Sequence, residues 1–441
     1  MKKITVTTFF IFISFCQITY SITKMFLDTN YKMSYIEYEN LDFNISTSTD
    51  NFNKVYSVLT VSLKTFIDNT QFEIEMNSLG EAGTENYQNT ISTTYSWQVY
   101  RPYPNIQFQP WLSQFYFKYK YDFVETFKIP YLKLNVDGIH TYFVAGRQRK
   151  EFVEGLVVGD NKIGYDGLSF GLSFGRFFYI DGLLSKLVSK QGFVDNRYFD
   201  LYCFLIGSKF YDEYNFGINT VIENDKMLQS EKIFYEFFIK RATEKYMYIL
   251  EYIMQRGSKQ NKDYSGSLWY FRGAIQGESR NFGKSMAGLV WLLSSGGSEH
   301  GRFNPTCTRS YEYMEPYGYG EFTRANARDI FFNLPDGYSG VFILGLDFSV
   351  NPLSKLYTGF EYYLYSSPEA PDDKPDASAT ERTLGAKKAI GLEYGISGRY
   401  EISKDVSVNF SYSIFDPTAN AYPKKQHDIA TKFVLSLVSK F

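Results

Sequence analysis

The strongest constraint in this sequence is an alternation of apolar and polar residues that recurs in segments of about ten residues. In the stretch QFYFKYKYDF, residues 114–123, every second residue is Phe or Tyr, and most residues between them are polar or charged. The same period of two recurs at 246–254, 342–350, 391–402 and 405–415. A period of two predicts β-strands with one apolar face and one polar face.

The composition indicates where the apolar faces lie. The chain has 39 Tyr and 41 Phe, and aromatics make up 19% of it. Its mean hydropathy is nevertheless −0.29, and no window after the N-terminus is apolar enough for a transmembrane helix. A soluble β-sandwich also alternates, but lone charges at strand centres and Tyr or Phe at strand ends favour a barrel with one face in lipid.

The connections between the predicted strands alternate in length. The turns at 351–354 and 403–405 are tight, whereas the sequence predicts long connections at 295–336, 366–385 and 416–427. Short periplasmic turns and long extracellular loops are typical of outer-membrane barrels. The fold class is therefore all-β, a closed antiparallel transmembrane β-barrel. Because single-chain bacterial barrels usually have an even strand number, we expect about eighteen strands, with sixteen as the alternative.

The region 150–196 fits this pattern least well. Part of it is expected to fold inward or to be helical, because Leu183, Leu184 and Leu187 have near-helical spacing.

The N-terminus has the features of a secretory signal. Lys2 and Lys3 precede an apolar run at 4–16, and the small residues Thr19 and Ser21 follow it. This order predicts a cleaved signal peptide at 1–21, an outer-membrane β-barrel at 22–441 and localisation in the bacterial outer membrane. The alternatives are an uncleaved N-terminal anchor and a lipoprotein modified at Cys16.

The last strand is amphipathic and ends on an aromatic residue. In TKFVLSLVSKF, Phe433, Leu435, Leu437 and Phe441 share one face. We expect this strand to pair with the first one, because an open sheet edge in lipid would leave backbone groups unsatisfied. The terminal aromatic strand resembles the signal that the outer-membrane assembly machinery reads, so that machinery and outer-membrane lipid are the expected partners.

Enzymatic and nucleic-acid functions have little support in the sequence. The three histidines, His140, His300 and His427, have neither metal-ligand nor triad spacing, and no phosphate-binding glycine motif is present. The formal net charge is only −2, which favours no nucleic-acid partner. We therefore expect no catalytic residues, metal or cofactor. Cys203 and Cys307 are compatible with one disulfide or with two thiols.

The inward charges are distributed unevenly. Predicted strands between 114 and 149 are mostly basic and those after 341 mostly acidic, so a transverse field could orient polar solutes, although the charges could also pair across the lumen. An Arg on the lipid face would cost roughly 2–4 kcal/mol at the midplane, which favours turning Arg147 and Arg149 inward or placing them at a strand end. The candidate residues of the solute path are Lys118, Lys120, Arg147, Arg149, Arg324, Arg328, Arg399 and Glu393.

Three stretches resemble alginate-export-type outer-membrane barrels. They are VAGRQRKEFVEGLVVGDNKIGYDGLSF (144–170), RANARDIFFNLP (324–335) and YSIFDPTANAY (412–422). The resemblance implies an 18-stranded monomeric channel whose Arg- and Lys-lined lumen passes an anionic polyuronate. By matching position it carries over four residues, Arg147, Asp160, Asp166 and Arg328. The acidic wall after 341 departs from a uniformly cationic lumen.

The sequence thus predicts a porin-like channel for polar, anionic or sugar-like solutes, with polysaccharide export of the alginate type as one form of that function. The alternative is a structural or adhesive barrel whose pore is blocked by loops.

Overall fold

The computed structural model describes most of the chain after residue 23. The described ranges are 24–40, 52–83, 108–129, 134–160, 164–175, 177–188, 198–210, 213–226, 229–259, 262–279, 283–296, 340–367, 388–417 and 428–441, together with 301, 303, 305, 310, 311, 315 and 316.

Eighteen strands of the described chain form one sheet. They are β1 (Lys24–Glu39), β2 (Phe52–Ile67), β3 (Thr70–Gly83), β4 (Phe108–Ile129), β5 (Leu134–Gln148), β6 (Tyr165–Phe174), β7 (Phe178–Val188), β8 (Tyr198–Phe210), β9 (Tyr214–Asp225), β10 (Ser230–Ala242), β11 (Tyr246–Lys259), β12 (Lys262–Ser279), β13 (Gly283–Ser294), β16 (Phe342–Leu353), β17 (Leu356–Ser367), β18 (Lys388–Glu401), β19 (Val406–Pro417) and β20 (Ala430–Lys440). A separate two-stranded ladder pairs β14 (Ser310–Tyr311) with β15 (Glu315–Pro316).

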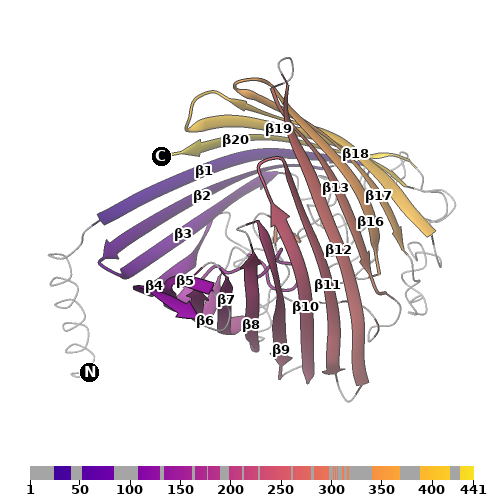
Figure 1. Ribbon diagram of the computed structural model, residues 1–441. Helices are drawn as coiled ribbons and strands as arrows, with labels where there is room; N and C mark the ends of the chain where they lie inside the picture. The colour runs from indigo at the N-terminus through magenta and orange to yellow at the C-terminus, as the bar shows by residue number, and fades with distance from the viewer. Residues whose placement is uncertain are drawn as a thin grey trace, which may run out of the picture.

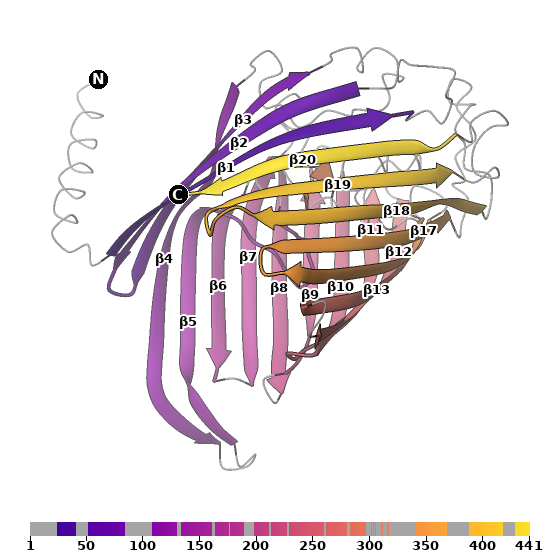
Figure 2. The same ribbon diagram turned by 90° about the horizontal axis from the view of Figure 1, so that it is seen from above.

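The sheet closes on itself (Figures 1 and 2). Each strand pairs antiparallel with the next strand of the sheet, and β20 pairs with β1 from Asn30↔Lys440 to Glu39↔Thr431. Two backbone hydrogen bonds between Thr29 and Phe441, of 2.9 and 2.8 Å, extend this closing ladder. Closure removes the open edge that would otherwise leave N–H and C=O groups unsatisfied. The predicted closed antiparallel barrel of eighteen strands is confirmed.

The two ends of the barrel differ in the length of their connections. At one end, the short-turn end, neighbouring strands are joined by short segments such as 68–69, 175–177, 354–355 and 402–405. At the other end, the long-loop end, the connections include 149–164, 368–387 and 418–429. The predicted alternation of short and long connections is therefore present in the structure.

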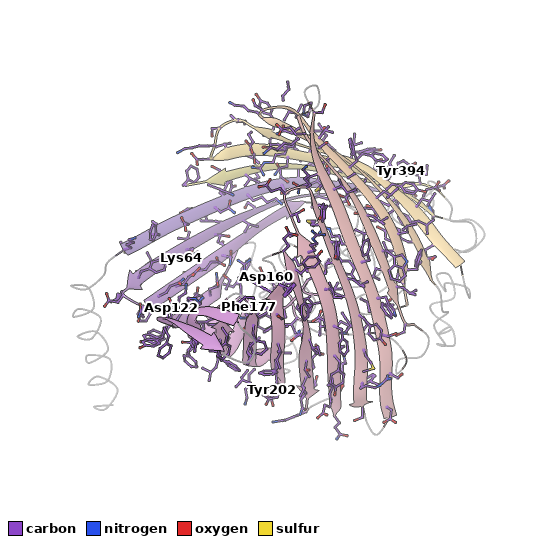
Figure 3. The ribbon with its side chains drawn as sticks, in the orientation of Figure 1. Lys64, Asp122, Asp160, Phe177, Tyr202 and Tyr394 are labelled. Carbon is purple, nitrogen blue, oxygen red and sulfur yellow. The ribbon has the colours of Figure 1, made fainter. Side chains whose placement is uncertain are left out.

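The outward face of the barrel is apolar and exposed. On β4 the exposed fractions of Phe115 and Phe123 are 56% and 47%, and Phe143 on β5 reaches 42%. Tyr202 on β8 also lies outward, and Figure 3 labels it on the outer side of the wall. Large apolar side chains exposed around a closed sheet are typical of a barrel whose outer surface contacts lipid.

The inward face divides into two halves. Along β7–β13 and β16 it holds one buried apolar cluster, which includes Leu183, Leu201, Val221, Phe234, Phe238, Ile249, Ile253, Leu268, Val290, Leu292 and Ile343. Buried polar side chains alternate with it on the same face, among them Asn219, Glu223, Glu236, Glu251 and Gln255. Along β1–β4 and β20 it carries mostly polar and charged residues, such as Asn30, Lys32, Ser62, Glu75 and Lys440. We call these the apolar half and the polar half of the lumen.

The helical alternative for the leucines of 181–188 is wrong. These residues belong to β7, where Leu183 is fully buried and Leu184 is 45% exposed, as expected for neighbours on opposite faces of a strand. In the described part of the chain, no helix has the length and apolar character needed to cross a membrane. Cys203 is a buried free thiol, and Cys307 lies outside the described residues.

Candidate functional site

The connection between β5 and β6 turns into the barrel, and two glycines flank it. Gly146 has a φ of +122°, and a Cβ at this position would lie 2.3 Å from the carbonyl oxygen of Phe115. Gly164 has a φ of +90°, and its Cβ would lie 2.3 Å from the carbonyl oxygen of Ser113. Only glycine fits such a conformation and such a close approach. We call residues 149–160 the inward segment.

Apolar side chains anchor the inward segment in the lumen. Phe152 and Leu156 are each 1% exposed, and Val157 and Val158 are fully buried. All four belong to the same buried cluster as the apolar half of the barrel wall. Filling that half with close-packed side chains excludes water from it. The region 150–160 therefore folds inward, as the sequence analysis expected for part of 150–196.

Ion pairs connect the inward segment to both halves of the wall. Arg149 Nε donates to Asp160 Oδ1 over 2.9 Å, and its Nη1 lies 3.1 Å from Glu75 Oε1 on β3. Lys150 Nζ lies 2.7 Å from Asp181 on β7, and Lys240 Nζ on β10 lies 2.9 Å from Glu154. Figure 3 labels Asp160 among the side chains inside the ring of strands. The segment is thus fixed at several points around the lumen.

A hydrogen-bond network on β2–β4 supports Arg149. Glu75 accepts hydrogen bonds from Ser113 Oγ (2.5 Å) and Gln114 Nε2 (3.1 Å) in addition to its contact with Arg149. Glu73 on the same face accepts from Tyr116 Oη (2.6 Å) and lies 3.3 Å from Lys64 Nζ. Both carboxylates are almost fully buried, so these donors offset the cost of removing them from water.

A cavity of about 500 Å³ lies in the polar half, beside the inward segment. Its walls come from β1–β4, β20 and Arg149. The lining residues are Asp28, Thr29, Asn30, Lys32, Thr60, Ser62, Lys64, Glu75, Asn77, Trp111, Arg149, Val438, Lys440 and Phe441. Within the described residues, no three His, Cys, Asp or Glu side chains are grouped so that they could hold a metal ion.

Four of the eight predicted solute-path residues lie on the inward face of described strands. Lys118 is half-buried with its Nζ 4.9 Å from the centre of the Tyr142 ring, and Lys120 lies two residues further along β4. Arg399 Nη2 lies 3.0 Å from Glu401, and Glu393 is fully buried and accepts a hydrogen bond from Tyr365 Oη (2.8 Å). These residues do not line the 500 Å³ cavity.

Of the other four, Arg149 lines the cavity, whereas Arg147 does not face the lumen. Arg147 is paired in register with Asp166, whose neighbours Leu168 and Phe170 on the same face are exposed on the outside of the barrel. The placement of Arg147 on the channel wall is therefore corrected. Arg147 lies next to the end of β5, where its Nε and Nη2 donate to Asp166 over 2.7 and 2.5 Å. Arg324 and Arg328 lie outside the described residues.

Most of the charged residues that line the cavity were not predicted from the sequence. Lys32 and Lys64 come from β1 and β2, whose inward faces are identified only by their pairing with β3 and β20. Lys440 was visible in the sequence, because it alternates with the apolar residues of the last strand. The predicted acidic wall is present: Asp347 and Glu361 are directly paired, and Glu393 and Glu401 share their face.

The comparisons with known proteins concern the fold. No family model matches the sequence, and no curated protein matches it. Among solved structures, OccAB1 of Acinetobacter baumannii superposes with a TM-score of 0.59 at 10% identity, covering 96% of this chain and 97% of that one. OccAB4 of the same organism gives 0.57 at 11% identity, covering 95% and 99%.

The outer membrane protein OprD from Pseudomonas aeruginosa gives a TM-score of 0.53 at 8% identity, covering 96% of this chain and 94% of that one. At such low identity the likeness shows the fold alone. This chain therefore has the porin-like barrel fold of these proteins, whereas the resemblance to the alginate-export type concerns function and enters the proposal below.

Proposed function

We propose that this protein is an outer-membrane channel for polar solutes, with a preference for anionic or sugar-like ones. The proposal rests mainly on the division of the lumen into two halves. The inward segment packs against the apolar half, while the polar half keeps a cavity lined by lysines, hydroxyl groups and amides. A hydrated solute would have to pass along the polar half, because entering the other half would displace closely packed side chains.

The charge of the polar half supports a preference for anions. The cavity is lined by four cationic side chains, Lys32, Lys64, Arg149 and Lys440, against the side-chain carboxylates of Asp28 and Glu75, and the last residue, Phe441, also lines it. Lys118 and Lys120 add positive charge on the inward face of β4. A fixed charge acts strongly on a solute that passes within one Debye length, about 8 Å. In a narrow passage the solute stays within this distance of the charged wall.

We place the barrel in the bacterial outer membrane, with the short-turn end toward the periplasm and with residues 1–21 removed as a signal peptide. The exposed apolar outer face and the length asymmetry of the connections support this placement. Mass spectrometry of the protein from outer-membrane fractions should give a chain that begins at residue 22. An intact residue 1 in that fraction would contradict the cleavage.

Export of an alginate-type polyuronate is a narrower form of the same proposal. The three resembling stretches and the lysines of the cavity support it, whereas the firmly anchored inward segment favours small solutes over a passing polymer. In the alternative function, a structural or adhesive barrel, loops would block the polar half.

Planar-bilayer recording on the purified protein tests the proposal. An open channel should give discrete conductance steps, and proteoliposomes that contain it should swell in neutral and acidic monosaccharides. Swelling in small sugars together with transport of polyuronate oligomers would favour the export form. Folded protein that inserts, as shown by heat-modifiable migration, but gives no steps would overturn the channel and favour the blocked barrel.

A further inference from the structure

The pairing register arranges part of the cavity lining in two neighbouring rows that cross the strands. Paired residues of adjacent strands lie about 5 Å apart, and alternate residues of one strand lie roughly 7 Å apart, so the two rows form one contiguous patch. The first row crosses β1–β4 as Asn30, Thr60, Asn77 and Trp111, and the second crosses β1–β3 as Asp28, Ser62 and Glu75. Thr60 and Ser62, both on β2, lie at the centre of this patch.

A carboxylate fixes the direction of the hydrogen bonds that lead to Thr60. Glu75 Oε1 accepts from Arg149 Nη1 (3.1 Å), and because a carboxylate only accepts, Ser113 Oγ must give it its single proton (2.5 Å). Asn77 must then donate to Ser113 Oγ through Nδ2 (2.6 Å), which leaves its Oδ1 as the acceptor for Thr60 Oγ1 (2.6 Å). The hydroxyl proton of Thr60 is therefore committed to Asn77.

A second carboxylate restricts Ser62 in the same way. Ser62 Oγ donates to Glu73 Oε1 over 3.4 Å, and Glu73 is the ion-pair partner of Lys64. A hydroxyl group has one proton and two lone pairs, so Thr60 and Ser62 present only lone pairs to the cavity. Asp28, which is exposed and directly paired with Ser62, adds a carboxylate that also only accepts. The centre of the patch therefore accepts hydrogen bonds and has no hydroxyl proton to donate.

Such a patch suits a solute that carries free hydroxyl groups. A hydroxyl proton can be donated to Thr60 or Ser62, whereas an acceptor without a proton at the same place would leave lone pairs facing lone pairs. Trp111, at the end of the first row, can pack against the C–H face of a sugar ring. The cavity volume of about 500 Å³ is within the usual range for small-molecule sites.

We propose that Thr60 and Ser62 are specificity-determining residues that recognise the free hydroxyl groups of a sugar by accepting hydrogen bonds from them, with the sugar ring toward Trp111. The inference rests on the proposed channel function and names the chemical group that the channel recognises, which is a hydroxyl proton. It requires no charge on the solute, so a neutral sugar is sufficient.

Fluorinated analogues of glucose separate hydrogen-bond donation from size, because fluorine resembles a hydroxyl group in size but has no proton to donate. In planar bilayers, the reduction of ion conductance with sugar concentration gives a dissociation constant. We would measure it for glucose and for each analogue in which one hydroxyl group is replaced by fluorine. In the wild-type channel, at least one analogue should bind about three- to tenfold more weakly than glucose, which corresponds to the loss of one hydrogen bond.

Thr60→Val and Ser62→Ala test the two residues separately. Each variant removes one acceptor with little change in volume, so glucose should bind about three- to tenfold more weakly and one fluorinated analogue should bind as well as glucose. Ser173→Ala, on β6 and outside this cavity, is the matched control and should keep the preference for glucose. Heat-modifiable migration checks that each variant is folded.

Bilayer recording also separates failure of this inference from failure of the channel. Conductance steps that glucose does not reduce, or equal dissociation constants for glucose and all its fluorinated analogues, would overturn the hydroxyl recognition and leave the channel standing. A preference for glucose that survives in both cavity variants, or that Ser173→Ala abolishes as fully as they do, would overturn it too. Folded, inserted protein without conductance steps would overturn the channel itself, and this inference with it.

Discussion

Lys240 Nζ lies 2.9 Å from Glu154 Oε1, and this ion pair joins the inward segment to β10 across 86 positions of sequence. Glu154 is mostly buried, with a side chain 16% exposed, whereas Lys240 is 45% exposed. Because solvent screens the partly exposed partner, the pair itself should stabilise the segment only modestly, by about 0.5–1 kcal/mol. The apolar contacts of the segment must therefore supply most of its attachment.

This leads to a prediction about Phe152. Phe152→Ala should lower the free energy of unfolding by about 3–5 kcal/mol, because it leaves a cavity in the packed half of the lumen. Urea unfolding of the lipid-reconstituted barrel, followed by Trp fluorescence, measures the change. Phe170→Ala on the outward face of β6 removes the same atoms from a 36% exposed site and should cost less. Equal losses in the two variants would contradict the anchoring role.

Gly146 should tolerate no side chain. Gly146→Ala places a Cβ 2.3 Å from the Phe115 carbonyl oxygen at a φ of +122°, so the inward turn after β5 should be strained and the melting temperature lowered. Gly277→Ala on β12 is the matched control, because its nearest neighbouring atom is 3.6 Å away. If the Gly146→Ala barrel has the same melting temperature as the Gly277→Ala barrel, the turn has another conformation.

The outward position of Arg147 predicts that replacing it affects ion selectivity less than replacing Lys118 and Lys120. Arg147→Gln should leave the reversal potential under a KCl gradient unchanged, because this side chain lies on the outward face beside Asp166. Lys118→Gln combined with Lys120→Gln should move it toward cation selectivity, because both face the lumen. A shift in Arg147→Gln as large as in the lysine variant would put Arg147 back in the solute path.

The closing strand should govern assembly. Leu435→Asp with Leu437→Asp puts two carboxylates on outward positions that are 44% and 41% exposed, where they would face lipid and weaken insertion. Fractionation and heat-modifiable migration should show loss of the folded outer-membrane form. Val438→Asp, which faces the polar cavity on the same strand, should assemble far better. Normal assembly of the double variant would contradict the membrane placement of this face.

The sequence was most informative where one face of a strand is uniform. Residues 114–123 alternate strictly, so β4 and its lumen-facing lysines could be predicted from periodicity alone. The same rule failed for Arg147, because β5 carries Thr141 and Ala145 outward and Val144 inward, and neither face is clearly apolar. The strand also ends at Gln148, so Arg149 turns inward although it has the same parity as Arg147.

The cavity itself could not be predicted from the sequence. Its walls join β20 to β1 and β2 through pairs such as Asn30↔Lys440, which lie at opposite ends of the chain. Local periodicity shows which residues share a face of one strand, but it does not show which strands pair where the barrel closes. The apolar half was not predicted for a related reason. Strands β7–β13 carry apolar residues on both faces, and those of the inner face pack against the inward segment, which local periodicity does not reveal.

The central claim is that solutes pass along the polar half of the lumen, and thiol labelling during single-channel recording tests it most directly. In a Cys307→Ser background, Thr60→Cys places a thiol in the polar cavity and Leu292→Cys places one in the packed half. A charged methanethiosulfonate reagent should reduce the current of Thr60→Cys channels and leave Leu292→Cys channels unchanged. Block of Leu292→Cys with no effect on Thr60→Cys would contradict the account.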